Sequence, residues 1–151
     1  MAALLHAKTV QLSGLAPLAE IVLRAGNTSD PHNARRTLKD AYQPDDDYDN
    51  VIGMSVLFKV GATADFLAQE GQFRHNRISL SFVAKLQEEL ASAGYELVLF
   101  ETPMPQAPFF LPDHHTLAVA HGGIVEPSLS DVAAEALMRS FLVVKNPYKQ
   151  A

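Results

Sequence analysis

The spacing of hydrophobic residues divides the chain into short strands and helices in mixed order. Alternating or continuously apolar runs predict strands at residues 4–12, 51–59, 96–102, 116–120 and 142–144, with 124–125 as a hairpin partner of the fourth. Apolar spacings of three to four predict helices at 15–24, from Ser29-Asp30-Pro31 to about residue 42, at 62–69, at 78–94 and from Ser128-Leu129-Ser130-Asp131 onward. Because strands and helices do not alternate regularly, we expect an α+β fold. It would be a single domain, residues 1–151, with a curved, mainly antiparallel sheet and packed helices.

Some of these elements have a second interpretation or a specific expectation attached. Residues 19–25 are an alternative strand, because Ile21-Val22-Leu23 is prone to extended structure. The helix at 78–94 is expected to end with Gly94 at its C′ position. The strand at 96–102 is apolar on both faces, which predicts a central strand. Gly53, inside a strand, predicts a bulge or a close approach of backbone.

Two loops stand out by composition. Prolines 103, 105, 108 and 112 prevent regular structure over ten residues, and the loop carries Phe109-Phe110-Leu111. These three residues either fold back on the core or form an interaction patch. The second loop, Asp45–Asp49, is acidic.

The composition narrows the class of protein. A net charge of −5 over 151 residues argues against nucleic-acid binding, which needs a basic face. No apolar run reaches the ~18–20 residues of a membrane span, and the apolar N-terminus lacks the basic start of a signal peptide. The absence of cysteine excludes disulfides and thiolate metal sites. We therefore expect a cytoplasmic protein.

Titratable chemistry is concentrated at Asp113-His114-His115-Thr116-Leu117. Adjacent residues of a strand point to opposite faces, so the two histidines are not a preset metal pair and we expect no metal site. The chain has no glycine-rich phosphate loop, and Gly53-Met54-Ser55-Val56 lacks the second glycine of a nucleophile elbow. A pair of Ser55 with His114 or His115 remains open on these grounds.

Three short features in order resemble a known family. They are Val22-Leu23-Arg24-Ala25, then Gly53-Met54-Ser55-Val56, then Asp113-His114-His115-Thr116-Leu117 followed by the start of a C-terminal helix. The pattern is similar to the small cytoactive toxins of type VI secretion systems, whose fold is like that of ADP-ribosyltransferases. Met54 stands where that family has Thr, and His115 where it has an aromatic residue.

The resemblance implies an ADP-ribosyltransferase-like fold and an enzyme that transfers ADP-ribose from NAD to a cellular acceptor. It implies that Arg24, Ser55 and Thr116 bind NAD, and that Ser55 and His114 are catalytic. It also implies a cognate immunity or antitoxin protein as partner. A carboxylate commonly stabilises the ribosyl centre, and Glu96, Glu101 and Glu126 are equal candidates for it.

Other interpretations stay open for the same residues. Arg24 could serve only in a salt bridge, Ser55 as a sheet hydroxyl, and His114 as a residue of a loop or strand edge. The whole chain could instead be a small acidic protein-binding module, such as an immunity protein or antitoxin. Its binding surface would then be the acidic loop and the Phe109–Leu111 loop.

Overall fold

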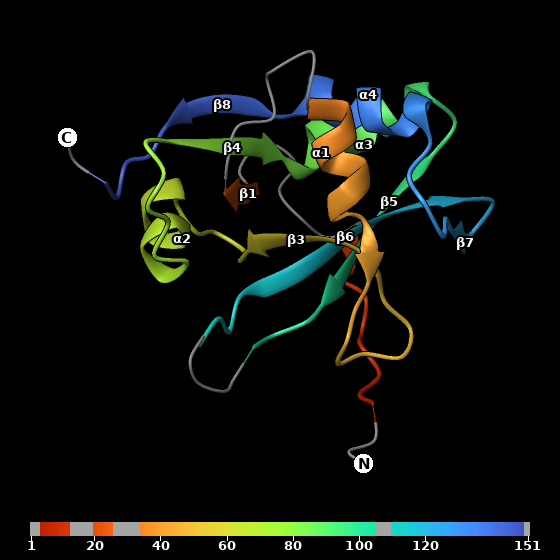
Figure 1. Ribbon diagram of the computed structural model, residues 1–151, viewed down its shortest axis with the longest axis horizontal. Coiled ribbons are helices and arrows are strands. Elements are labelled where there is room, and N and C mark those ends of the chain that lie inside the picture. Colours follow the sequence, from red (N-terminus) through yellow and green to blue (C-terminus); the bar gives the residue numbers. More distant parts are fainter. Residues whose placement is uncertain (1–3, 13–19, 26–33, 105–109, 150–151) are drawn as a thin grey trace.

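In the computed structural model, all strands of the described residues belong to one antiparallel sheet (Figure 1). The structure describes residues 4–12, 20–25, 34–104 and 110–149. The elements are β1 (Ile21–Ala25), α1 (Ala34–Ala41), β2 (Gln43–Pro44), β3 (Ile52–Phe58), α2 (Ala64–Glu70), β4 (Arg77–Phe82), α3 (Val83–Ser92), β5 (Glu96–Glu101), β6 (His114–His121), β7 (Ile124–Val125), α4 (Asp131–Ser140) and β8 (Leu142–Lys145). The main strand order is β5-β6-β3-β1-β4-β8, with β2 beside β3 and β7 beside β6.

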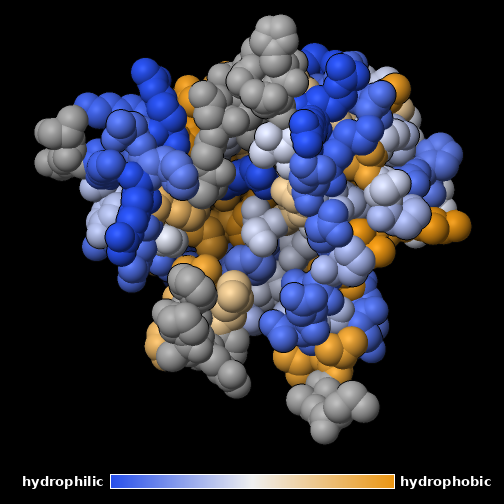
Figure 2. Space-filling model, in the orientation of Figure 1, coloured by the Kyte–Doolittle hydropathy of each residue, from blue (hydrophilic) through white to orange (hydrophobic). Residues whose placement is uncertain are grey.

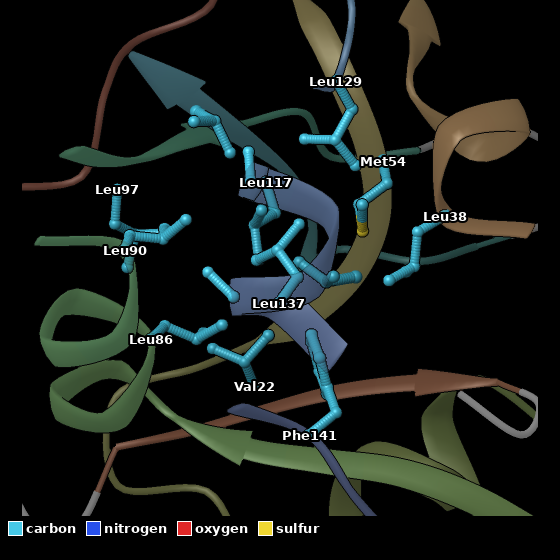
Figure 3. Close-up of a cluster of buried hydrophobic side chains, with 14 of the residues drawn as sticks. Val22, Leu38, Met54, Leu86, Leu90, Leu97, Leu117, Leu129, Leu137 and Phe141 are labelled. Carbon is cyan, nitrogen blue, oxygen red and sulfur yellow. The ribbon is translucent and has the colours of Figure 1, made fainter. Parts of the chain in front are cut away.

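Helices cover both faces of the sheet. Leu86 and Leu90 of α3, Leu137 of α4 and Leu38 of α1 meet apolar strand residues on one face to form the largest core cluster (Figure 3). On the other face, α2 packs against β1, β3 and β4 in a smaller cluster. Neighbouring residues of β1 show the alternation directly, because Val22 belongs to the first cluster and Leu23 to the second.

Much of the predicted pattern is confirmed. The fold is α+β with an antiparallel sheet, and the strands expected at 51–59, 96–102, 116–120, 124–125 and 142–144 are β3, β5, β6, β7 and β8. The helix expected at 62–69 is α2, which Thr63 caps and Gly71 ends. The helix expected after Ser128 is α4, whose N-cap is Ser130. The helix expected up to residue 42 is seen as α1, and residues 29–33 lie outside the described part.

Two predicted helices are wrong in part. Residues 21–25 form β1, so the alternative strand is correct there, and residues 15–19 lie outside the described residues. Residues 78–82 belong to β4, and the helix begins only at Val83. Ile78-Ser79-Leu80-Ser81-Phe82 alternates apolar and polar residues, and pairing with β1 and β8 outweighs the helical spacing further along. Gly94, with φ of +88°, follows this helix as expected.

Two strand predictions also need correction. Residues 4–12 form no extended strand but make isolated bridges, Leu5 to Tyr48 and Thr9 to Phe100. The strand at 96–102 is not central, because β5 ends the main strand order. Its two faces are nevertheless covered, because Leu97 and Leu99 belong to the largest core cluster and Phe100 to a separate one. Residues 8–10 hydrogen-bond along its outer edge.

Gly53 marks a close approach of two strands, as the sequence indicates. A Cβ atom at this position would collide with the carbonyl oxygen of Leu117 and lie 2.7 Å from Cγ2 of Thr116. Only glycine lets β3 and β6 pair at this distance. Among the described residues, no helix has the length and apolar character needed to cross a membrane.

Candidate functional site

A cavity of about 450 Å³ brings together three side chains that the sequence singled out: Arg24, Ser55 and His114. Figure 2 shows this side of the molecule hollowed between α2 and α1, with hydrophobic side chains at the base of the hollow. The other residues that line the cavity are apolar: Leu23, Ala41, Val56, Leu57, Phe73, Met104 and Leu111. A site with few polar groups in an apolar wall is typical of small-molecule binding.

The cavity lies where β1 and β3 stop pairing. These strands are in register only at Val22–Phe58 and Leu23–Leu57, and the next residues along them, Arg24 and Val56, do not pair. Consecutive residues of both strands line the cavity, so the opening cuts across the sheet at this gap. This explains how Arg24 lines the same cavity as Ser55, although alternation along β1 assigns its side chain to the opposite face.

Arg24 is a partly buried cation whose Nε has no hydrogen-bond partner within the described part of the chain. Burial lowers the pKa of its guanidinium below the ordinary value, but arginine remains charged at neutral pH. No salt bridge involving Arg24 is seen among the described residues. A buried donor left without an acceptor is costly, and an anionic ligand in the cavity would relieve this cost.

Ser55 and His114 come from neighbouring strands and share one face. In the β3–β6 ladder, Ser55 is opposite Thr116 and Leu57 is opposite His114. Directly opposed side chains point the same way, so Ser55 and His114 lie diagonally across the two strands. Ser55 is exposed in a strand whose other residues are buried or half-buried. The cavity is the reason for this exposure.

The imidazole of His114 is held by Thr102. Nδ1 of His114 lies 2.8 Å from the Thr102 carbonyl oxygen and 2.9 Å from Thr102 Oγ1. A carbonyl oxygen can only accept, so Nδ1 carries the proton and Nε2 is the acceptor of the neutral ring. Burial lowers the pKa of His114 below the ordinary histidine value, so the ring is neutral at pH 7. His114 can therefore accept a proton from a group bound in the cavity.

His115 lines a second cavity, of about 440 Å³. Its Nδ1–H donates to the Asp113 carbonyl oxygen at 2.8 Å, and its ring stands edge-on to Phe58. The charged or titratable side chains that line this cavity are His6, Lys8, Tyr48, Glu101, Asp113 and His115. The two histidines therefore serve different cavities, as strand alternation predicts.

Other predicted site residues lie elsewhere. Thr116 is buried and does not line the first cavity; its hydroxyl lies 3.0 Å from Thr102 Oγ1. Of the three candidate carboxylates, Glu101 lines the second cavity. Glu96 accepts a hydrogen bond from the Gly123 N–H at the far end of β6. Glu126 follows β7 and also does not line the first cavity.

Sequence reasoning missed several residues of the first cavity. Ala41, Phe73, Met104 and Leu111 line it from α1, from the loop after α2 and from the two ends of the proline loop. Met104 and Leu111 form an isolated antiparallel bridge, with N–H to carbonyl distances of 2.9 Å and 2.7 Å. Their apolar character was visible in the sequence, but no periodicity links them to Ser55. Of the three apolar residues of the proline loop, Leu111 turns to the cavity, Phe110 is 65% exposed, and Phe109 lies outside the described residues.

Comparisons with protein-family models, with curated proteins and with solved structures found no match to this chain. The resemblance to the secretion-system toxins therefore remains a prediction from short motifs.

Proposed function

We propose that the protein is a toxin-like enzyme that binds NAD in the Arg24 cavity and transfers its ADP-ribose to a cellular acceptor. The observation that supports this most is the convergence of Arg24, Ser55 and His114 on one cavity. The family resemblance assigns these residues to one site, yet they come from three strands and are separated by 31 and 59 positions (24 to 55, 55 to 114). In this proposal the fold is ADP-ribosyltransferase-like and the protein acts in the cytoplasm, where NAD is present.

Each residue has a role that fits its surroundings. Arg24, whose Nε has no partner in the described part of the chain, binds a phosphate of NAD, since guanidinium groups bind phosphate through paired N–H donors. The exposed hydroxyl of Ser55 hydrogen-bonds the nicotinamide ribose. The neutral His114 presents Nε2 as a proton acceptor. Apolar residues of the wall, Phe73 and Met104 among them, pack against the rings of the ligand.

The proposed reaction needs one proton transfer. The bond between C1′ of the ribose and the nicotinamide nitrogen breaks, and nicotinamide leaves with the bonding electrons. The acceptor's lone pair forms the new bond to C1′, and His114 Nε2 takes the acceptor's proton. General-base catalysis of this kind contributes about 10²–10⁴-fold to the rate.

The experiment is incubation of the purified protein with NAD and a cell lysate, followed by quantification of released nicotinamide. We expect His114→Ala to lower the rate at least about 100-fold through loss of the general base. His115→Ala is the matched control, because it removes the neighbouring imidazole from the other cavity. We expect its rate to stay within about threefold of the wild type.

Inducible expression gives a second test of the same proposal. The wild type and His115→Ala should arrest growth, and His114→Ala should restore it. Normal growth with accumulation of soluble wild-type protein, together with no release of nicotinamide, would exclude the proposed function.

One observation favours the alternative of a protein-binding module. Phe110 is 65% exposed beside the cavity residue Leu111, and Asp46, Asp47 and Asp49 of the acidic loop are exposed. A module of this type would form a stoichiometric complex with a protein encoded nearby, such as a cognate toxin. Co-purification of that complex, lost in Phe110→Asp, with no NAD turnover would favour this alternative. A catalytic protein could also bind a cognate immunity protein through these loops.

A further inference from the structure

Two buried threonines that do not line the cavity form a hydrogen-bonded network with His114. Thr102 is 1% exposed and Thr116 is 4% exposed. Thr102 Oγ1 lies 2.9 Å from His114 Nδ1 and 3.0 Å from Thr116 Oγ1. Nothing in the sequence marked Thr102, which directly follows the last residue of β5.

The backbone explains why this network can form. The β5–β6 register places Thr102 opposite His114, one position beyond the Glu101–His115 pair. Thr102 N–H donates to the His114 carbonyl oxygen at 3.2 Å, but His114 N–H donates to Leu111 at 3.1 Å instead of returning the bond. The Thr102 carbonyl oxygen is therefore left to accept from the imidazole Nδ1–H at 2.8 Å.

The Thr102 carbonyl oxygen fixes the direction of the hydrogen bond to the imidazole. Since the carbonyl oxygen requires a proton on Nδ1, that N–H is shared with Thr102 Oγ1, whose lone pair must face it. A second hydrogen bond joins the hydroxyls of Thr102 and Thr116, and either hydroxyl can donate it. The carbonyl fixes the tautomer, and the hydroxyl, held by Thr116, fixes the plane of the ring.

We propose that Thr102 is a positioning residue that holds His114 with Nδ1 protonated and Nε2 available as the proton acceptor of the cavity. This inference rests on the proposed function only for its effect on the rate. Thr116, expected from the sequence to bind NAD, acts here through Thr102 as a second support. Fixing the tautomer of a catalytic histidine through its other nitrogen is a general requirement of such sites.

The first test reads the imidazole itself. Two-bond ¹H–¹⁵N correlation spectra of the full chain, labelled with ¹⁵N-histidine, identify which nitrogen of each imidazole is protonated, and His114→Gln assigns the signals. We expect the Nδ1–H form for His114 of the wild type. The Nε2–H form, or an equal mixture of both, would overturn the inference.

The second test removes only the hydroxyl. Thr102→Val keeps the shape and the carbonyl oxygen but takes one acceptor from the imidazolium Nδ1–H, so the pKa of His114 should fall further. Thr102→Ser should restore the wild-type titration. A merely structural threonine would change the melting temperature of both variants without moving this titration, and an unchanged titration in a folded Thr102→Val protein would overturn the inference.

The rate gives the third readout. With NAD, we expect kcat of Thr102→Val to fall about tenfold, a part of the ~10²–10⁴-fold that a general base supplies, with KM unchanged within about twofold. The acid limb of its pH–rate profile should move to lower pH together with the titration, and Thr102→Ser should recover both. If the wild type turns over no NAD, the proposed function fails and the two spectroscopic tests alone decide the role of Thr102.

Discussion

The two cavities that reach the start of β6 hold adjacent histidines but differ in what surrounds them. They have similar volumes, about 450 and 440 Å³. Burial lowers the pKa of both histidines, and each donates its Nδ1–H to a backbone carbonyl oxygen. Taken alone, His114 and His115 are therefore nearly equivalent. What distinguishes the two histidines is the set of charged and apolar side chains around each ring.

The surroundings separate a site that needs a ligand from one that does not. In the second cavity, the carboxylates Glu101 and Asp113 and the amine of Lys8 provide both signs of charge around His115. In the first cavity, the cation Arg24 stands in an apolar wall with Nε unpaired within the described residues. An unbalanced charge in an apolar cavity is a stronger indication of a ligand than the histidine is.

The largest expected effect comes from removing that charge. Arg24→Met keeps an unbranched, flexible side chain and abolishes its donors, so we expect the dissociation constant for NAD to rise at least about 100-fold, as for loss of a charged hydrogen-bond partner. Isothermal titration calorimetry measures it. Lys8→Met, which removes the cation of the second cavity, is the matched control and should bind NAD like the wild type.

The same Arg24→Met substitution should stabilise the protein without ligand. An unpaired buried donor costs about 1–3 kcal/mol, and methionine removes it while still filling the space of the aliphatic part of arginine. Urea unfolding of the wild type and of Arg24→Met measures the free energy of unfolding of each. A gain in stability combined with a loss of binding identifies a residue kept for a ligand, whereas a loss of both would indicate that Arg24 has a structural partner.

The next largest effect is on stability and concerns the pairing of β3 with β6, the strands that carry Ser55, His114 and His115. Gly53→Ala places a Cβ against the Leu117 backbone and forces β3 away from β6, so we expect a loss of about 2–3 kcal/mol in the free energy of unfolding. Ser55→Ala, two residues further along β3, should stay within about 0.5 kcal/mol because Ser55 is exposed. Adding Thr116→Ser to Gly53→Ala should not rescue stability, since the closest obstacle is the Leu117 carbonyl oxygen.

Gly53 illustrates what the sequence could predict. A glycine inside an apolar strand is a signal that can be recognised in a short stretch of sequence. The same holds for the capping residues of α2 and α4 and for the opposite orientation of His114 and His115. Each of these could be expected from the local sequence, although the strand that Gly53 approaches, at Leu117, is distant in the chain. The resemblance placed Arg24 and Ser55 in one site, but the alternation of β1 alone would have put Arg24 on the other face.

What the sequence could not predict depends on contacts between distant segments. The gap between β1 and β3, which admits Arg24 to the cavity, arises because their register ends after two pairs. Thr102 becomes important only through the β5–β6 register and the unreturned backbone bond of His114. The helical spacing of residues 78–94 was misleading at its start because β1 and β8 supply pairing partners for β4.

The smallest expected effect lies at the boundary of the two cavities. Glu70 Oε2, at the end of α2, accepts the Asp113 N–H at 3.3 Å, and Asp113 lines the second cavity while His114 next to it lines the first. Burial, and then the neighbouring Asp113 carboxyl, raise the pKa of Glu70 from 4.5 to about 7. The folded state therefore binds more protons than the unfolded chain between these two values.

The sign of the pH dependence follows from that difference. A raised carboxyl pKa favours the folded state in acid, and this contribution is lost as the pH rises from about 4.5 to about 7. Because Glu70 is only half-buried and solvent screens its charge, the loss should be no more than about 1 kcal/mol. Urea unfolding at pH 5 and pH 8 should show a smaller decrease for Glu70→Gln than for the wild type. Glu88→Gln, which neutralises an exposed carboxylate on α3, should leave the decrease unchanged, and equal behaviour of both variants would exclude a proton held between Glu70 and Asp113.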